Sequence, residues 1–181
     1  KNKNAQGYIQ WTTDPNFSGS NTASVKALPD NSDTEVTLDS STVTTSANTI
    51  HYYRAVANAS GRGDAAYGDI YAVLTRPDKP ANANVTPSGS SATVSFTAVT
   101  AATDVDVSYE VVCSATGKTT KSQTGTGTSL TVTGLELGIT YTCEVTATNS
   151  FASTFNKVTS DKRAGGGKSN ATTLTLAVPL E

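Results

Sequence analysis

Short segments in the second half of the chain alternate hydrophobic and polar residues. They are residues 92–98, 107–113, 129–135, 141–149 and 172–178. In the fourth of them Tyr141, Cys143 and Val145 would face a core, while Thr142 and Glu144 would face water. A period of two residues is typical of half-buried β-strands, and these segments lack the 3.6-residue period of a helix. Turn-forming residues separate them, so this half of the chain predicts a β-sandwich.

The first half shows the same kind of pattern less completely. Its strand-like segments are residues 8–19, 50–61 and 68–77. Between the halves, Pro77 and Pro80 stand around two charged residues in the sequence TRPDKP. A polar joint with two prolines is typical of the connection between domains. We therefore expect one domain at 1–77 and another at 78–181.

The composition agrees with an all-β chain and narrows the classes of partner. The 181 residues include 32 Thr and 20 Ser, no Met, and only 15% charged residues. Thr, Val and Tyr favour strands, and Ser, Gly and Asn favour the turns between them. The formal charge of -2 and pI near 5.4 argue against a nucleic-acid partner. No apolar run approaches the roughly 18 residues that cross a bilayer, so we expect no membrane insertion.

The second half resembles the fibronectin type III domain. The segments VSYEV and SLTVTGLELGITYTCEVTATNS carry the resemblance, with a strand-C tyrosine, Tyr109, and a strand-F tyrosine, Tyr141. A leucine before the E-to-F turn and a glycine within it complete the pattern. The likeness extends over residues 80–181, and Phe96 stands where the family usually has tryptophan. The resemblance implies an immunoglobulin-like β-sandwich.

The first half carries a less complete version of the same pattern. The segment IHYYRAVANASG is similar to the family's F strand, which would turn Tyr53, Ala55 and Ala57 inward and Arg54 outward. His51 stands where the family has its corner tyrosine. The fold class that the whole chain predicts is therefore all-β, with two immunoglobulin-like, fibronectin type III-like sandwiches in tandem.

The start of the first domain is shorter than the family pattern. Residues 8–19 fit either strand B, with Trp11 in the core, or strand C, with Tyr8 as its tyrosine, and the spacing to His51 favours strand B. Only about seven residues precede Tyr8, so we expect an N-terminally incomplete domain. Lys1 would then be a processed end or an internal boundary of a longer protein. The alternative is that a strand from another molecule completes the sandwich.

Catalytic chemistry has little support in this sequence. The chain has one histidine, His51, and two cysteines, with no motif that joins them into a catalytic or metal-binding group. We expect no enzyme activity, no cofactor and no metal. By the resemblance, Cys113 and Cys143 lie on neighbouring strands C and F with core-facing side chains. They would form a cross-strand disulfide or stay as two buried thiols.

Three groups of residues are candidates for contacts with partners. By the resemblance, Arg62, Gly63 and Asp64 fall in the F-to-G loop that carries this tripeptide in the integrin-binding module of fibronectin, although the same residues are ordinary turn formers. The segment 149–170 is long for a loop between strands, and it would be either an open flexible loop or a contact for an anionic polymer or partner. Its basic residues are Lys157, Lys162, Arg163 and Lys168. Four N-glycosylation motifs begin at Asn16, Asn58, Asn84 and Asn170.

These features predict a non-enzymatic spacer, adhesive or scaffold segment of a larger secreted or cell-surface protein. Its partners would be proteins or polysaccharides at the cell surface or in the matrix. Two alternatives remain open. One is a self-assembling extracellular filament subunit completed by strand donation between molecules, and the other is a receptor ligand of the integrin type that acts through Arg-Gly-Asp.

Overall fold

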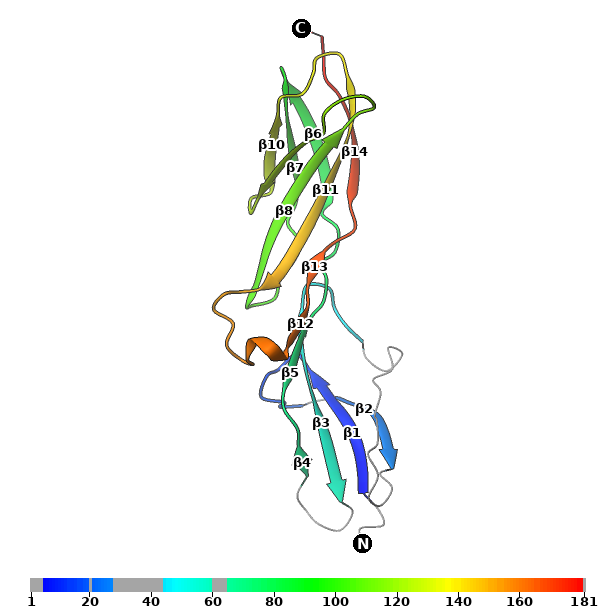
Figure 1. The fold of residues 1–181 in the computed structure, drawn as a ribbon, viewed down its shortest axis with the longest axis vertical. Helices are drawn as coiled ribbons and strands as arrows, with labels where there is room; N and C mark the ends of the chain where they lie inside the picture. Colours follow the sequence, from blue (N-terminus) through cyan, green and yellow to red (C-terminus); the bar gives the residue numbers. More distant parts are fainter. Residues whose placement is uncertain (1–4, 20, 28–43, 60–64, 181) are drawn as a thin grey trace. The chain divides into compact units, whose positions relative to one another are not determined.

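The computed structural model describes residues 5–19, 21–27, 44–59 and 65–180 (Figure 1). Within these ranges the regular structure is almost entirely β-strand, and the one helical element is a single 3₁₀ turn, Ser160–Lys162. The all-β prediction is therefore confirmed. In the described part of the chain, no helix has the length and apolar character needed to span a bilayer.

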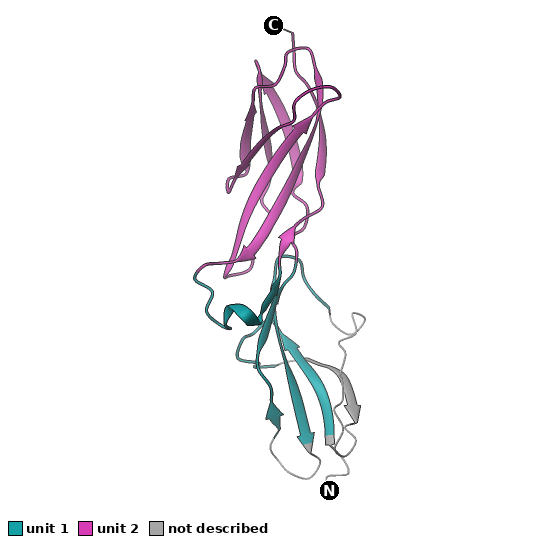
Figure 2. Cartoon of the chain, viewed as in Figure 1, with its two compact units in different colours: residues 1–75, 154–165 teal, residues 76–153, 166–181 magenta. Residues whose placement is uncertain are grey.

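The chain divides into two compact units (Figure 2). Unit 1 contains residues 1–75 and 154–165, and unit 2 contains residues 76–153 and 166–181. The chain first passes from unit 1 to unit 2 between residues 75 and 76, close to the boundary expected from Pro77 and Pro80. The assignment of 154–165 differs from the expected division, because this segment adds a strand to unit 1 and buries apolar side chains there.

Unit 2 is a sandwich of two sheets. One sheet has the strand order β10-β7-β6, and the other has the order β13-β11-β8-β9, with β14 also paired to β11. The strands are β6 (Ala81–Ser88), β7 (Ser91–Thr97), β8 (Val105–Ser114), β9 (Lys121–Gly125), β10 (Ser129–Thr133), β11 (Thr140–Phe151), β13 (Gly167–Lys168) and β14 (Thr172–Ala177). The paired strands of both sheets are antiparallel. This arrangement confirms the sandwich predicted for the second half.

The core of unit 2 consists of the inward-facing residues of both sheets. Val94 comes from one sheet, Val111 and Val145 come from the other, and all three are fully buried. Phe96 packs against Tyr109 with ring centroids 4.7 Å apart. An aromatic ring therefore lies against the strand-C tyrosine even though the residue is not the tryptophan usual in the family.

Two buried tyrosines use their hydroxyl groups to hold connections between strands. The Tyr141 hydroxyl accepts a hydrogen bond from the Glu136 backbone N–H at 3.1 Å, and only 1% of Tyr141 is exposed. The Tyr109 hydroxyl accepts one from the Val99 backbone N–H at 3.1 Å. Each ring fills the core while its polar end satisfies a donor that no ladder partner reaches.

The described residues of unit 1 form one sheet with the order β12-β5-β3-β1-β2, and β4 pairs with β3 (Figure 1). Its strands are β1 (Ala5–Thr12), β2 (Asn21–Ala27), β3 (Ile50–Ala59), β4 (Ala66–Tyr67), β5 (Tyr71–Leu74) and β12 (Arg163–Gly165). All pairs are antiparallel except β12 with β5, which is parallel.

The position of β1 corrects one expectation from the sequence. β1 lies between β2 and β3, just as β8 lies between β9 and β11 in unit 2. It therefore occupies the strand-C position, and the assignment of residues 8–19 to strand B is wrong. Spacing misled because loop length changes at little cost in free energy, so the number of residues between two strands is a weak guide to which strands they are.

β3 buries side chains on both faces, including the face that was expected to point outward with Arg54. Tyr52 and Val56 are 4% and 3% exposed, whereas Ala55 and Ala57 are exposed. The ring of Phe155, from the segment 154–165, stacks on Tyr52 with centroids 6.3 Å apart. A segment distant in sequence thus covers the side of the sheet that the family pattern would leave in water.

Candidate binding surfaces

The structure separates the sequence-predicted contact residues rather than gathering them into one site. Arg62, Gly63 and Asp64 lie outside the described residues. The four asparagines of the glycosylation motifs are all exposed, as a glycan acceptor must be. They are Asn16, Asn58, Asn84 and Asn170, and glycosylation at them stays a prediction.

The segment 149–170, for which the sequence left an open loop or a partner contact as alternatives, is built into unit 1 over residues 154–165. Phe155 and Val158 are 3% and 8% exposed, which is the burial of core residues. The Arg163 guanidinium donates hydrogen bonds to the carbonyls of both, with Nη2 at 2.6 Å from Phe155 O and 3.0 Å from Val158 O. It also lies over the Phe155 ring, 4.7 Å from its centroid. Arg163 therefore connects backbone groups of its own segment and stabilises the segment in a compact conformation.

A glycine allows β12 to approach β5 closely. Gly165 has φ +86°, and a Cβ at this position would lie 2.2 Å from the Leu74 carbonyl oxygen. Any other residue would collide with that strand and would adopt an unfavourable backbone conformation. The first of the three consecutive glycines, 165–167, is thus needed for strand pairing.

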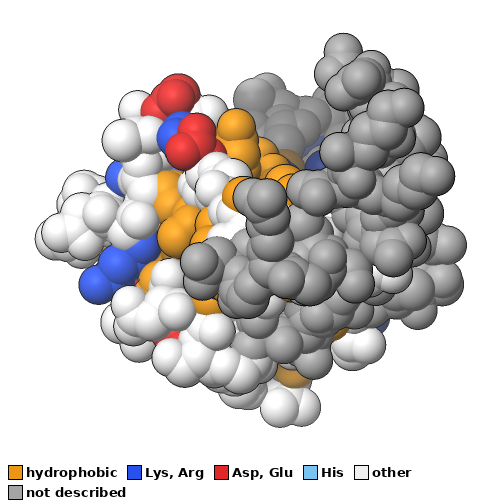
Figure 3. All heavy atoms as spheres, turned by 90° about the horizontal axis from the view of Figure 1, so that it is seen from below, with side chains coloured by type: hydrophobic (Ala, Val, Ile, Leu, Met, Phe, Trp, Pro, Cys, Tyr) orange, Lys and Arg blue, Asp and Glu red, His pale blue; other side chains and the backbone are white. Residues whose placement is uncertain are grey.

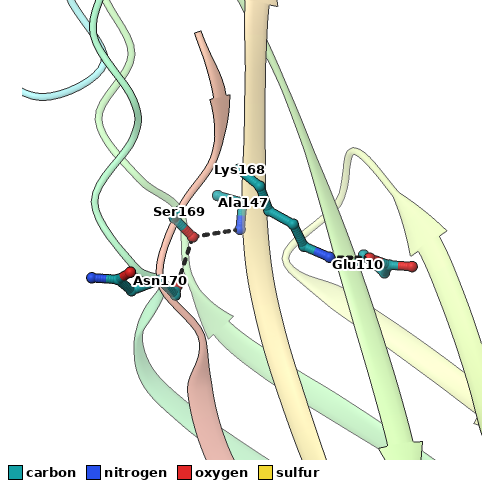
Figure 4. Close-up of polar contacts among 5 residues, drawn as sticks. All are labelled: Glu110, Ala147, Lys168, Ser169 and Asn170. Carbon is teal, nitrogen blue, oxygen red and sulfur yellow. Dashed lines mark hydrogen bonds and ion pairs between the residues drawn. The ribbon is translucent and has the colours of Figure 1, made fainter.

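The other basic residues of the segment differ in what they contact. Lys162 Nζ lies 2.7 Å from Asp69 Oδ2, and the hydrogen bond to Asp69 raises the pKa of Lys162. Lys168 Nζ lies 2.6 Å from Glu110 Oε2 (Figure 4). Lys157 is exposed and forms no ion pair with any described residue. A joint basic contact surface at these four positions is therefore poorly supported.

In the same region Ser169 supplies a side-chain acceptor for a backbone N–H next to the paired residues of β11 and β13. The Ser169 Oγ accepts a hydrogen bond from the Ala147 N–H at 3.0 Å and donates one to the Asn170 carbonyl at 2.7 Å (Figure 4). The Ser169 backbone N–H donates to the Ala147 carbonyl. A side chain thus replaces a ladder acceptor at the point where pairing passes from β13 to β14.

The two cysteines lie directly opposite each other on β8 and β11 and form a disulfide. Their sulfurs are 2.05 Å apart, and both residues are fully buried. The bond joins the two central strands of one sheet of unit 2. Both cysteines have a structural role in this fold.

Sequence reasoning missed a cluster on the sheet of unit 1. The guanidinium carbon of Arg54, on β3, lies 4.2 Å from the centroid of the Phe17 ring and 4.0 Å from that of the Tyr67 ring. Its Nε donates a hydrogen bond to Gln10 Oε1 at 2.9 Å. Arg54 was expected to point to water, but it lies on the same face of β3 as the buried Tyr52 and Val56 and is only partly exposed. Nothing in the sequence brings Phe17 and Tyr67 to it.

The strand order defines unit 2 as an immunoglobulin-like sandwich. More particularly, residues 78–161 match the family model of the fibronectin type III domain. The match to the fibronectin type III family thus extends from residue 78 to residue 161 of the chain.

Two solved structures from chicken are similar to the chain. The FN1–FN3 domains of CNTN1 share 16% identity, with 98% of this chain and 56% of that chain covered and a TM-score of 0.44. A segment of two fibronectin type III domains from tenascin shares 17% identity, with 97% and 84% covered and a TM-score of 0.48. The chain thus spans 56% of the length of the CNTN1 structure. No curated protein sequence matches the chain.

Proposed function

We propose that this chain is a non-enzymatic structural and adhesive segment of an extracellular protein, with two fibronectin type III-like domains in tandem. Domains of this family typically serve as structural or adhesive modules of extracellular proteins. The buried disulfide of unit 2 fits an oxidising compartment, because such bonds are rare in the cytosol.

The tandem arrangement has its main support in the sheet of unit 1. Its strand order β5-β3-β1-β2 repeats the order β14-β11-β8-β9 of unit 2, with antiparallel pairing in both. In both units this order begins with the strand that comes last in the sequence and ends with the strand that follows strand C. This repetition is the observation that carries the proposal for the first domain.

A structural role also fits the one histidine of the chain. His51 is 7% exposed and lies against Trp11, with ring centroids 6.2 Å apart. Burial lowers its pKa, so the ring is neutral near pH 7. A neutral ring packed against an indole, in a strand, is better suited to a core than to proton transfer with a substrate.

The filament alternative has one observation in its favour. The residues of unit 1 that the structure describes form a single sheet, and a sandwich needs a second. Donation of a strand by a neighbouring molecule would supply it. At the β5 edge, however, β12 of the same chain is already paired.

Light scattering over a concentration series, followed by negative-stain imaging, separates these two functions. A structural segment should be monomeric at every concentration. Reversible fibrous species that disappear when a missing strand is supplied in the same chain would favour the filament. The receptor alternative rests on sequence alone, and it requires cation-dependent cell attachment that Asp64→Glu abolishes while Asp69→Glu does not.

A further inference from the structure

Arg54 presents part of its guanidinium without an acidic partner. Phe17 and Tyr67 flank the group, and the hydrogen bond from Nε to Gln10 fixes its rotation. No carboxylate among the described residues forms an ion pair with it. The two terminal nitrogens of a guanidinium form a planar fork that matches a carboxylate, and flanking rings strengthen the fork by limiting its hydration.

Phe17 is held in place at some cost to the backbone. It has φ +57°, which residues with a side chain rarely adopt. Asp14 fixes this turn: its carboxylate accepts hydrogen bonds from the backbone N–H groups of Asn16 and Ser18 at 2.9 and 3.1 Å, and its carbonyl accepts one from Phe17. These bonds, that of Asn16 foremost, lower the pKa of Asp14. Strained residues held this firmly gather at functional sites.

Tyr67 is the exposed side of the cluster. It pairs with Val56 on β3, and the neighbouring Gly68 N–H donates a hydrogen bond to the Ala55 carbonyl. Despite this fixed position, 57% of Tyr67 is exposed. Tyr8 lies in the same row of the sheet, since it also pairs with Val56. In the view of Figure 3, hydrophobic side chains reach the surface beside charged ones.

We propose that Arg54, Tyr67 and Phe17 form a binding site for a saccharide unit that carries a carboxylate, such as a uronate. The terminal nitrogens of Arg54 donate two parallel hydrogen bonds to the carboxylate. The open face of Tyr67 packs against the sugar ring. Phe17 contacts the guanidinium as well and keeps it in position. Gln10 keeps the fork aligned through Nε.

The charge around the cluster favours a uronate over other anions. Densely sulfated polymers are held by several cations, whereas Arg54 is the one cation of the cluster, and Lys162 is paired with Asp69. An acidic peptide would gain most from adding a strand to a sheet edge, whereas Arg54 lies on β3, an inner strand of this sheet. This inference goes beyond the structural role, because a spacer needs no ligand and would remain one if no saccharide bound.

An NMR titration of the whole ¹⁵N-labelled protein tests the proposal. The probes are trisaccharides of galacturonate, mannuronate and glucuronate, and the signal is the Arg54 Nε–H resonance. We expect a saturable shift with at least one of them. The methyl ester of that trisaccharide should bind about tenfold more weakly or worse, since it lacks the charge for the bidentate pair.

Variants distinguish recognition from a general effect on the fold. Arg54→Lys keeps the charge but loses the fork, and Tyr67→Ala removes an exposed ring, so each should weaken binding about tenfold. Lys162→Ala is the matched control, because it removes another cation of unit 1, and it should bind normally. Trp11 fluorescence verifies that each variant is folded.

Three results would overturn the proposal. One is the absence of a shift with all three trisaccharides, and a second is equal binding of the methyl ester. The third is tighter binding of triglutamate than of every uronate, which would assign the site to an acidic peptide. Any of these results would remove the saccharide site only. The proposed structural role would still be tested separately, by light scattering.

Discussion

Replacement of Phe155 by alanine should destabilise unit 1, although the residue lies between two strands of unit 2 in the sequence. The ring is 3% exposed, stacks on Tyr52, and lies under the Arg163 guanidinium. Truncation of a buried phenylalanine costs about 3–5 kcal/mol, and the lower end applies to a ring that packs on one side of a single sheet. The lost contact with Arg163 adds about 0.5–1 kcal/mol. We expect a loss of about 3–4 kcal/mol.

The assay is urea unfolding followed by tryptophan fluorescence. The sequence has one tryptophan, Trp11, and it lies in β1, so the signal reports unit 1. With a urea dependence of about 1–2 kcal/mol per molar, the midpoint of Phe155→Ala should fall by about 1.5–4 M. Lys157→Ala is the control, because it changes an exposed residue two positions away and should leave the midpoint unchanged. A midpoint within about 0.3 M of the original for Phe155→Ala would refute the assignment of this segment to unit 1.

Three further perturbations test other parts of the structure. Replacing Cys113 and Cys143 together by alanine should destabilise unit 2 by about 3.6 kcal/mol, from the chain entropy of a loop with a sequence separation of 30, as measured by urea unfolding under circular dichroism. Tyr141→Phe should cost about 1–2 kcal/mol in the same assay, because the Glu136 N–H loses its acceptor; an unchanged midpoint would mean that water replaces it. Unit 1 should lose stability as the pH falls below about 6.5, since burial lowers the pKa of His51 and the unfolded chain binds the proton more readily, and His51→Gln should remove this dependence from the fluorescence midpoint.

The fold of unit 2 could be predicted because its strands have one polar and one apolar face. Along β11, Tyr141, Cys143 and Val145 are buried while Thr142 and Glu144 are exposed, as the alternation indicates. A shift of register by one residue would place every one of these side chains on the wrong face. Local pattern and tertiary packing therefore agree in this unit.

The face of β3 could not be predicted, because both of its faces carry apolar or aromatic residues. Arg54 shares a face with Tyr52 and Val56, and His51 shares the other face with Tyr53 and Ala55. Each face therefore carries a polar residue beside apolar or aromatic ones, and neither is marked as the solvent side. Phe155 decides the matter, and it comes from a segment about a hundred positions away. Contacts over such a distance leave no periodic signal in the sequence.

The role of the glycine run and the Arg54 cluster were hidden for a related reason. Glycine suggests flexibility in a sequence, yet Gly165 is required by the closeness of the Leu74 carbonyl on another strand. Likewise, the rings of Phe17 and Tyr67 meet Arg54 through strand pairing and a strained turn. Such sites depend on which strands are neighbours. The spacing to His51 had placed β1 at the strand-B position, whereas it occupies the strand-C position.

Hydrogen exchange of residues 154–165 most directly measures whether the chain is shared between the units in this way. The pairing of β12 with β5 predicts that the Arg163–Gly165 amides that bond to β5 are protected, and that they open with the same free energy as the amides of β3. Phe155→Ala should release both sets together and leave β11 protected. Exchange of the whole segment at the rate of an open loop, with β3 still protected, would contradict this structure of unit 1.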